Sequence, residues 1–312
     1  MIEVLNTLLP VFALIGVALL LGRRGFLSRG FMAELNRLIF WVSLPALIVH
    51  SLATAPGLPQ DTLPITVIFF VATILVILLC FPASRLLRLP RERLGTFVQA
   101  AFRGNLAYTG LPIVVFALND QPREVVASAV AQLMFVLAPS MLLYNGTAVF
   151  LLVGSKEGFS FRKLGDICRK VATNPLILAS ALGVGFFFLP FELPRFILGT
   201  LDLAGQMAAP AALFCVGGAM AFVSMEGRYR SATVATVLKV AVLPAITAGM
   251  LRFVEVDPTA RLVLLVLSAC PTAVASYIMA KELDGDEALA AGSIILSTAA
   301  CIPVLGLIIA FG

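Results

Sequence analysis

The residues best suited to bind a polar ligand lie together in one hydrophobic stretch, residues 102–112. Asn105 is the strongest candidate, because its amide has donors and an acceptor and can hold a carboxylate without a permanent charge. Tyr108 follows three residues later and would share a face with Asn105 on a continuous helix. Arg103 adds a cation inside an apolar segment, where ionisable residues are usually functional. Together these side chains favour a binding site for a small anion.

The same stretch contains residues that oppose a continuous helix. Pro112 has no amide proton, and its ring clashes with the carbonyl four residues earlier. Leu111, directly before it, is pushed away from helical dihedrals, while Gly104 and Gly110 lower the cost of leaving the helix. We therefore expect a helix that Pro112 breaks within the membrane. Its free backbone groups would have to face protein or a watery cavity.

A second stretch of this kind, residues 269–277, lies late in the chain and contains Pro271, Thr272 and Ser276. Pro271 is at the centre of an apolar segment predicted to run over residues 261–281. Two interrupted segments in matching positions of two halves are typical of the binding site of a transporter. The alternative is that both prolines are ordinary kinks, because proline is common in membrane helices.

Several of these residues have a second interpretation. Asn105 could instead cap the end of the broken helix. Arg103 could meet the anionic substrate, pair with Asp202, or extend towards the cytoplasmic surface. Asp202 and Gln132 are polar groups within other hydrophobic segments, and we consider both as possible sites of ion or proton coupling. Asp202 could also lie at the outer interface, close to Arg195.

The composition is that of an integral membrane protein. The chain has 312 residues, of which 60% are hydrophobic and 12% charged, and its mean hydropathy is +1.04. The net charge of +5 sits in short loops between apolar segments, which argues against binding of nucleic acid. Five cysteines in apolar surroundings give neither a disulfide framework nor zinc-type spacing. With one histidine and no catalytic or nucleotide-binding motif, we expect neither an enzyme nor a cofactor.

Hydrophobic segments long enough to cross a bilayer define the fold class, all-α with ten membrane spans. The basic residues concentrate in the loops after the first, third, fifth and seventh spans, so the positive-inside rule places both termini outside. We expect two inverted five-helix repeats, residues 1–153 and 171–312, joined by a cytoplasmic loop over residues 154–170. The predicted spans cover residues 4–21, 35–53, 63–79, 95–118, 125–153, 171–189, 196–223, 232–253, 261–281 and 288–311.

These motifs resemble those of the auxin efflux carrier family, of which the chain looks like a bacterial member related to the plant PIN-type carriers. One departure is that PIN-type carriers have an asparagine near the crossover in the ninth span, where this chain has Thr272 and Ser276. The resemblance covers essentially the whole chain and rests on Asn105, Gly110, Pro112, residues 271–282, Asn174, Pro175, Pro210, Gly217 and Gly218.

The resemblance implies the fold of sodium/proton antiporters and bile-acid symporters, in which the fourth and ninth helices cross at broken, proline-bearing centres. It implies a scaffold domain from spans 1, 2, 6 and 7, a moving transport domain from spans 3–5 and 8–10, and a homodimer formed through the scaffold helices. Its members carry small organic anions.

We therefore expect a secondary transporter of auxin-like or dicarboxylate anions in the inner membrane of a bacterium. It would act by elevator-type alternating access and hold its substrate at the crossover, with proton or sodium coupling possible. The alternatives are a channel or membrane receptor for an organic anion and, less favoured, an intramembrane enzyme.

Overall fold

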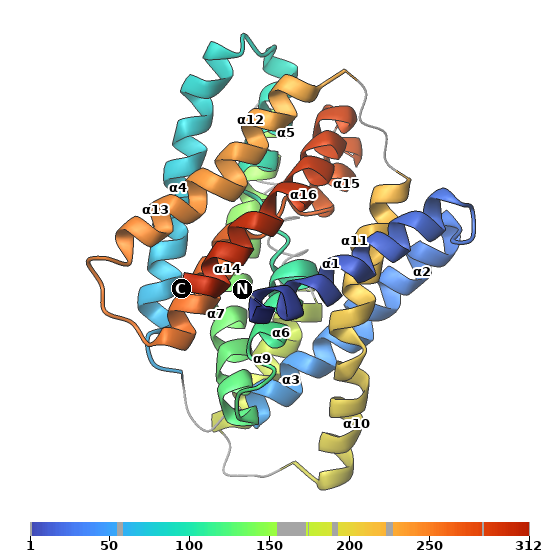
Figure 1. Cartoon of the computed structure of the whole chain (residues 1–312), viewed down its shortest axis with the longest axis vertical. Coiled ribbons are helices and arrows are strands. Elements are labelled where there is room, and N and C mark those ends of the chain that lie inside the picture. The colour runs from blue at the N-terminus through green and yellow to red at the C-terminus, as the bar shows by residue number, and fades with distance from the viewer. Residues whose placement is uncertain are drawn as a thin grey trace.

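A computed structural model describes residues 2–54, 59–154, 173, 175–188, 193–222, 227–282 and 284–311 of the chain. Within these ranges every regular element is a helix, and the ribbon in Figure 1 shows them packed as one bundle. An isolated antiparallel bridge joins Gly104 to Thr272, and no β-sheet occurs in the described ranges. The all-helical fold class predicted from the sequence is therefore confirmed at this level.

The helices of the first half overlap the predicted spans, although the helix of the second span begins at Arg29 rather than at residue 35 and that of the third ends at Leu86 rather than at residue 79. Before the long connection they are α1 (Ile2–Arg23), α2 (Arg29–Leu38), the π-helix η1 (Ile39–Ser43), α3 (Leu44–Ala53), α4 (Thr62–Leu86), α5 (Arg91–Phe102), the π-helix η2 (Leu106–Gly110), α6 (Leu111–Ala117) and α7 (Arg123–Gly154).

The second half has a similar order of elements. They are α9 (Pro175–Phe188), α10 (Arg195–Gln206), α11 (Ala208–Ala221), α12 (Tyr229–Val237), the π-helix η3 (Leu238–Val242), α13 (Leu243–Met250), α14 (Pro258–Ala269), α15 (Ala275–Glu282) and α16 (Glu287–Phe311).

Five continuous helical segments in the described ranges are long and apolar enough to cross a membrane: Arg29–Ala53, Thr62–Leu86, Arg195–Ala221, Tyr229–Met250 and Glu287–Ala310. The predicted fourth and ninth spans do not reach this length, because each is divided into two shorter helices. Exposed apolar side chains form a stripe along α4. Leu63, Val67, Val71, Ile74 and Leu78 recur at helical spacing on α4 and are exposed.

The helix break in the fourth span is not where the sequence predicted it. The chain leaves the helix at residues 103–105, and Leu111 has helical dihedrals, φ −59° and ψ −50°. Pro112 occupies the first turn of α6, directly behind η2, so the expectation that Pro112 breaks the helix is wrong. A π-turn absorbs the clash between a proline ring and the preceding turn.

A π-helix directly before a proline occurs three times in the described part of the chain. Each five-residue π-helix is followed at once by a Leu-Pro pair, with the prolines at Pro45, Pro112 and Pro244. The proline removes one backbone donor and crowds the carbonyl four residues before it. Widening the helix locally keeps the chain helical through the proline.

Two groups of helices pack closely among themselves. In one group α1 lies along α11, where Figure 1 shows them side by side, and α3 packs on α9 and α10. Glycine permits the first contact, because a Cβ added at Gly217 would overlap the backbone carbonyl of Ile15. In the other group α4, α5, α7, α12, α14 and α16 pack on one another.

Candidate functional site

The two helix breaks lie side by side and are joined by backbone hydrogen bonds. The amide of Asn105 donates to the carbonyl of Pro271 at 2.8 Å, and the amide of Ala273 donates to the carbonyl of Arg103 at 2.9 Å. These two bonds flank the bridge between Gly104 and Thr272. The two motifs singled out in the sequence are therefore neighbours in the fold, although they are far apart in the chain.

At the first break, an interhelical bond replaces the missing helical one. The carbonyl of Ala100 lies four residues before Gly104 and would accept its amide in a continuous helix. The amide of Gly104 instead meets the hydroxyl of Tyr144 on α7, at 3.4 Å. The carbonyl of Ala100 accepts the hydroxyl of Thr272 at 2.8 Å. Thr272, predicted as a substrate ligand, thus caps the carboxyl end of α5.

The second break repeats this arrangement with different side chains. The carbonyl of Ser268 lies four residues before Thr272, whose amide donates to the Ser297 hydroxyl on α16 at 2.9 Å. The carbonyl of Ser268 accepts a hydrogen bond from Nζ of Lys239 at 2.7 Å. Gly104 and Thr272 are the two residues of the bridge. In both halves, the carbonyl four residues before the bridge residue accepts a hydrogen bond from a side chain outside its own helix.

Lys239 is a functional candidate that was not predicted from the sequence. It lies on η3, its side chain is fully buried, and no carboxylate in the described ranges forms an ion pair with it. The signal in the sequence was a lone ionisable residue inside a hydrophobic span. Tyr144 and Ser297 gave no such signal, because a tyrosine and a serine are common in helical bundles.

Asn105 is buried at the break and does not act as a helix cap. It is 7% exposed, and its backbone has φ −82° and ψ 65°, outside the helical region. Its side chain makes no capping hydrogen bond to η2, so the alternative of a structural cap finds no support. Because Asn105 is not helical, the expected common helix face with Tyr108 does not apply. Tyr108 lies half-buried on η2.

Other predicted residues line the same region. A Cβ added at Gly110 would lie 2.9 Å from both Sγ of Cys270 and Cδ2 of Leu267, so glycine allows η2 to approach the end of α14. Pro271 contributes its carbonyl to the pairing of the breaks. The hydroxyl of Ser276 is buried and has no hydrogen-bond partner within the described part of the chain. Such a group is available to a polar ligand.

Arg103 extends from the break towards α15 and α7. Its residue is 9% exposed, its Nη1 lies 2.8 Å from Sδ of Met279, and its guanidinium lies 5.8 Å from the ring centre of Tyr144. The Tyr144 ring also meets Phe102 edge-on, with centroids 5.4 Å apart. Tyr144 therefore supports both the backbone of the break and the cation beside it.

The two residues considered for ion coupling have other contacts. The Asp202 carboxylate accepts from the Gln206 amide on its own helix at 3.0 Å, and α10 packs on α3, η1 and α11. Gln132 on α7 donates to the carbonyl of Gln60, just before α4, at 3.0 Å. Among the described residues, no hydrogen bond connects Asp202 or Gln132 to either break. Their role in coupling stays a prediction.

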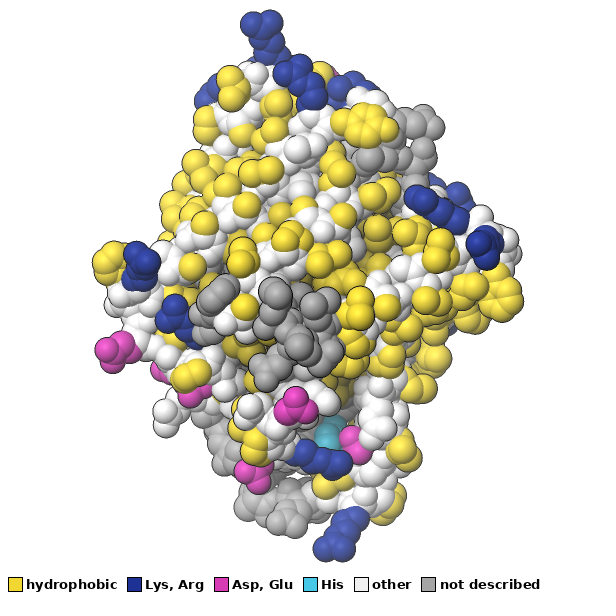
Figure 2. Space-filling model, viewed as in Figure 1, with side chains coloured by type: hydrophobic (Ala, Val, Ile, Leu, Met, Phe, Trp, Pro, Cys, Tyr) yellow, Lys and Arg dark blue, Asp and Glu magenta, His cyan; other side chains and the backbone are white. Residues whose placement is uncertain are grey.

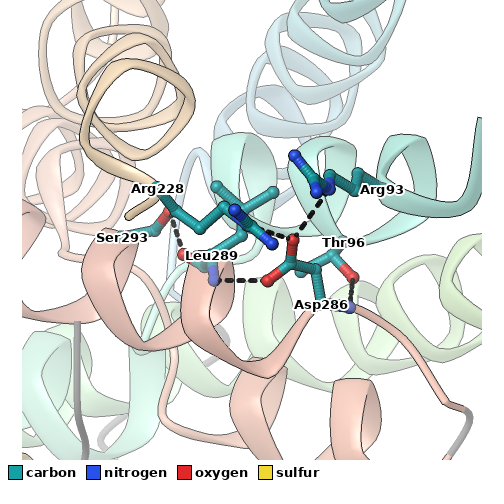
Figure 3. A network of polar contacts seen from close by, with 6 residues as sticks. All are labelled: Arg93, Thr96, Arg228, Asp286, Leu289 and Ser293. Carbon is teal, nitrogen blue, oxygen red and sulfur yellow. Dashed lines mark hydrogen bonds and ion pairs between the residues drawn. The ribbon is translucent and has the colours of Figure 1, made fainter. Parts of the chain in front are cut away.

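A polar network ties the other ends of these helices together (Figure 3). The Asp286 carboxylate accepts from Arg228 Nε at 2.8 Å and lies 3.2 Å from Arg93 Nε. It also accepts from the amide of Leu289 in the first turn of α16, and the Asp286 amide donates to the Thr96 hydroxyl. This network joins α5, α16 and the segment before α12.

A cavity of about 290 Å³ lies beside the network, with Arg88, Arg93, Arg228 and Arg230 in its lining. Four arginines give this end of the bundle a positive potential, which would attract anions towards it.

The sequence matches a family described as "Membrane transport protein" over residues 3–309. The chain belongs to this family. The match confirms the resemblance to the auxin efflux carriers, because this is their family. By its family, the protein is a multi-pass membrane transporter.

Two relatives of this membrane transport protein agree with that assignment. A protein of Rhizobium meliloti (strain 1021) named "Putative malonate transporter" is 30% identical over 227 residues, which is 71% of this chain and 68% of the relative. An "Uncharacterized transporter" of Methanocaldococcus jannaschii is 22% identical over 291 residues, which is 91% of this chain and 90% of the relative.

Proposed function

We propose that this protein is a secondary carrier of small organic anions, with dicarboxylates such as malonate as the first candidates. The observation that carries the proposal is the pair of joined helix breaks in an apolar interior, beside the buried ammonium group of Lys239. The helices that restart at Leu106 and Ala275 turn their positive ends towards the breaks. Such ends bind the carboxylates of transported substrates. The name of the Rhizobium relative supports the choice of malonate.

The site we propose is centred on Asn105, with Tyr108, Arg103 and Ser276 as further ligands. Asn105 supplies an amide at the start of η2, and Ser276 supplies a hydroxyl that has no partner within the described ranges. Gly110, Pro112, Pro271 and Thr272 shape the backbone around these groups.

We propose further that the fold consists of ten membrane spans in two inverted repeats, whose fourth and ninth helices cross at the breaks. The equivalence of the two breaks supports this proposal. The amide of Gly104 is directed to α7, in the predicted fifth span, and the amide of Thr272 to α16, in the predicted tenth. Equivalent amides of the two halves thus donate to equivalent helices, as expected for two repeats related by a pseudo-two-fold axis.

An elevator mechanism would move α4–α7 and α12–α16 against a scaffold of α1–α3 and α9–α11. The packing supports this division, because each group has extensive contacts within itself, and the breaks belong to the moving group. We propose a homodimer formed through the scaffold helices. We also place the carrier in the inner membrane with both termini outside. On the face shown in Figure 2, the upper end carries basic side chains alone and the acidic ones lie in the lower half, which suits a cytoplasmic face at the upper end.

Substrate binding can be tested by thermal stabilisation of the purified protein over a series of mono- and dicarboxylates. We expect malonate-like dianions to raise the Tm. Asn105→Ala should weaken the binding of the active anion by about 5- to 150-fold, which corresponds to ~1–3 kcal/mol for a lost buried hydrogen bond. Asn119→Ala, at an exposed position near the end of α6, is the matched control and should bind as wild type does. Wild-type affinity in Asn105→Ala would move the site away from the breaks.

Counterflow in proteoliposomes separates a carrier from a channel. A carrier loaded with unlabelled anion accumulates labelled anion transiently, because the same site carries both in exchange. A channel equilibrates the label without this overshoot. Flux without an overshoot would replace the carrier by the alternative of an anion channel.

A further inference from the structure

We propose that Lys239 is a tethered cation that takes the place of a coupling sodium ion at the carboxyl end of α14. The proposed carrier would therefore work without sodium. This inference rests on the proposed transport function where it is tested by anion flux. Its test by thermal stability needs no substrate.

The end of α14 has the features of a cation site. The carbonyl of Ser268 has lost its helical partner, since the amide of Thr272 donates to the Ser297 hydroxyl at 2.9 Å. The carboxyl end of a helix carries a partial negative charge. In transporters with broken helices, carbonyls of this kind coordinate sodium or receive protons. Here Nζ of Lys239 lies 2.7 Å from the Ser268 carbonyl and fills that place.

The opposite break shows that a cation is not needed merely to cap a carbonyl. There, the neutral hydroxyl of Thr272 satisfies the equivalent carbonyl of Ala100 at 2.8 Å. A buried ammonium group costs far more to desolvate than a hydroxyl. Capping the Ser268 carbonyl therefore does not by itself explain a charged side chain at this position, and the charge of Lys239 must have a further role.

The surroundings of Lys239 are fitted to an ammonium group. A Cβ added at Gly104 would lie 3.3 Å from Cε and 3.4 Å from Nζ of Lys239, so the glycine leaves room for the lysine. The nearby thiols of Cys270 and Cys301 each donate to a carbonyl of their own helix, at 3.2 Å. The lysine itself is fully buried. Within the described ranges, its charge faces backbone dipoles and thiols rather than a carboxylate.

The first test uses the wild-type protein. Uptake or counterflow of the transported anion is measured with sodium replaced by potassium and by N-methyl-D-glucamine. We expect rates within about twofold of each other, because the coupling cation is part of the chain. A loss of about tenfold or more without sodium would overturn the proposal, whatever the behaviour of any variant.

The second test follows the Tm of purified variants. Lys239→Ala removes the cation and opens space, and we expect the Tm to fall by roughly 2–10 °C, since a buried carbonyl loses its partner. Methylammonium or sodium should restore a large part of this loss. Lys239→Met fills the space without a charge, so added cations should not stabilise it beyond their effect on the wild type.

An equal response of Lys239→Ala and Lys239→Met to the added cations would overturn the proposal. Anion transport by Lys239→Met at the wild-type rate would also overturn it. If Lys239→Ala does not fold, sodium dependence of the wild type and transport by Lys239→Met still decide. If the wild type transports no organic anion, the proposed function fails, while restoration of the Tm by methylammonium still tests the cation site.

Discussion

Replacing Thr272 by valine tests whether the hydroxyl at the first break holds the end of α5. The hydroxyl donates to the carbonyl of Ala100 at 2.8 Å, and Thr272 is 1% exposed. Valine has nearly the same shape, so the substitution removes the hydrogen bond and leaves the packing in place. The carbonyl has no helical donor to return to, because the amide of Gly104 is directed to the Tyr144 hydroxyl.

The expected cost follows from that unsatisfied carbonyl. A buried acceptor that loses its partner costs about 1–3 kcal/mol. Each kcal/mol lowers the Tm of a medium-sized domain by roughly 2–4 °C, so we expect a fall of about 2–12 °C. The amide of Thr272 keeps its bond to Ser297, since that bond involves only the backbone of residue 272.

The assay is thermal unfolding of the purified protein in detergent, with two controls. Thr272→Ser retains a hydroxyl and should recover most of the stability. Thr298→Val is the matched control, because Thr298 is also buried but its hydroxyl donates to the Ile294 carbonyl of its own continuous helix at 2.7 Å. That carbonyl keeps its helical amide, so little stability should be lost. Equal stability of the two valine variants would refute the reasoning.

Three further predictions concern stability. Gly110→Ala should cost about 1–3 kcal/mol by overpacking, because the new Cβ would lie 2.9 Å from a sulfur at the end of α14. Gly146→Ala, with open space at its Cβ, should not lower the Tm. Asp286→Asn should cost at most ~1 kcal/mol at low salt, since its two arginine partners are 34% and 32% exposed. Asp286→Ala should cost about 1 kcal/mol more, because the cap of α16 is also lost. Ser297→Ala should lower the Tm more than Tyr144→Phe, because the amide bonds they accept are 2.9 Å and 3.4 Å long.

The sequence predicted the elements that position the site better than the site itself. Hydrophobic length located the helices, and the polar residues at 103–105 and around Pro271 marked the two interruptions. Asn105 was found because a polar amide stands out in an apolar span. The membrane environment makes these signals strong, since every backbone and side-chain polar group there needs a partner.

The sequence did not predict how proline would be accommodated. Pro112 was expected to end a helix, but a π-turn before it keeps the helix continuous, and the break occurs at Gly104 instead. Local propensity indicates where a helix is strained. The strain is relieved where neighbouring groups can accept hydrogen bonds from the released amides. The positions of those groups depend on tertiary packing.

The roles of Lys239, Tyr144 and Ser297 depend on the same tertiary information. Each residue lies on a different helix from the carbonyl or amide that it satisfies. Its partner is therefore fixed by helix packing, not by spacing in the chain. Lys239 was the one of the three with a visible cost, because a charge in an apolar span has to be offset by its surroundings.

This dependence on several helices limits how the proposed carrier can move. The groups left unsatisfied at the breaks find their partners on α7, η3 and α16 and on the opposite break. Separating either break from these partners would leave buried groups unpaired, at about 1–3 kcal/mol each. The helices that carry and support the breaks should therefore move as one body. The surface that can slide at lower cost is their contact with α1, α3 and α11, where the described contacts are less extensive. The elevator motion that we propose would preserve the hydrogen bonds at the site.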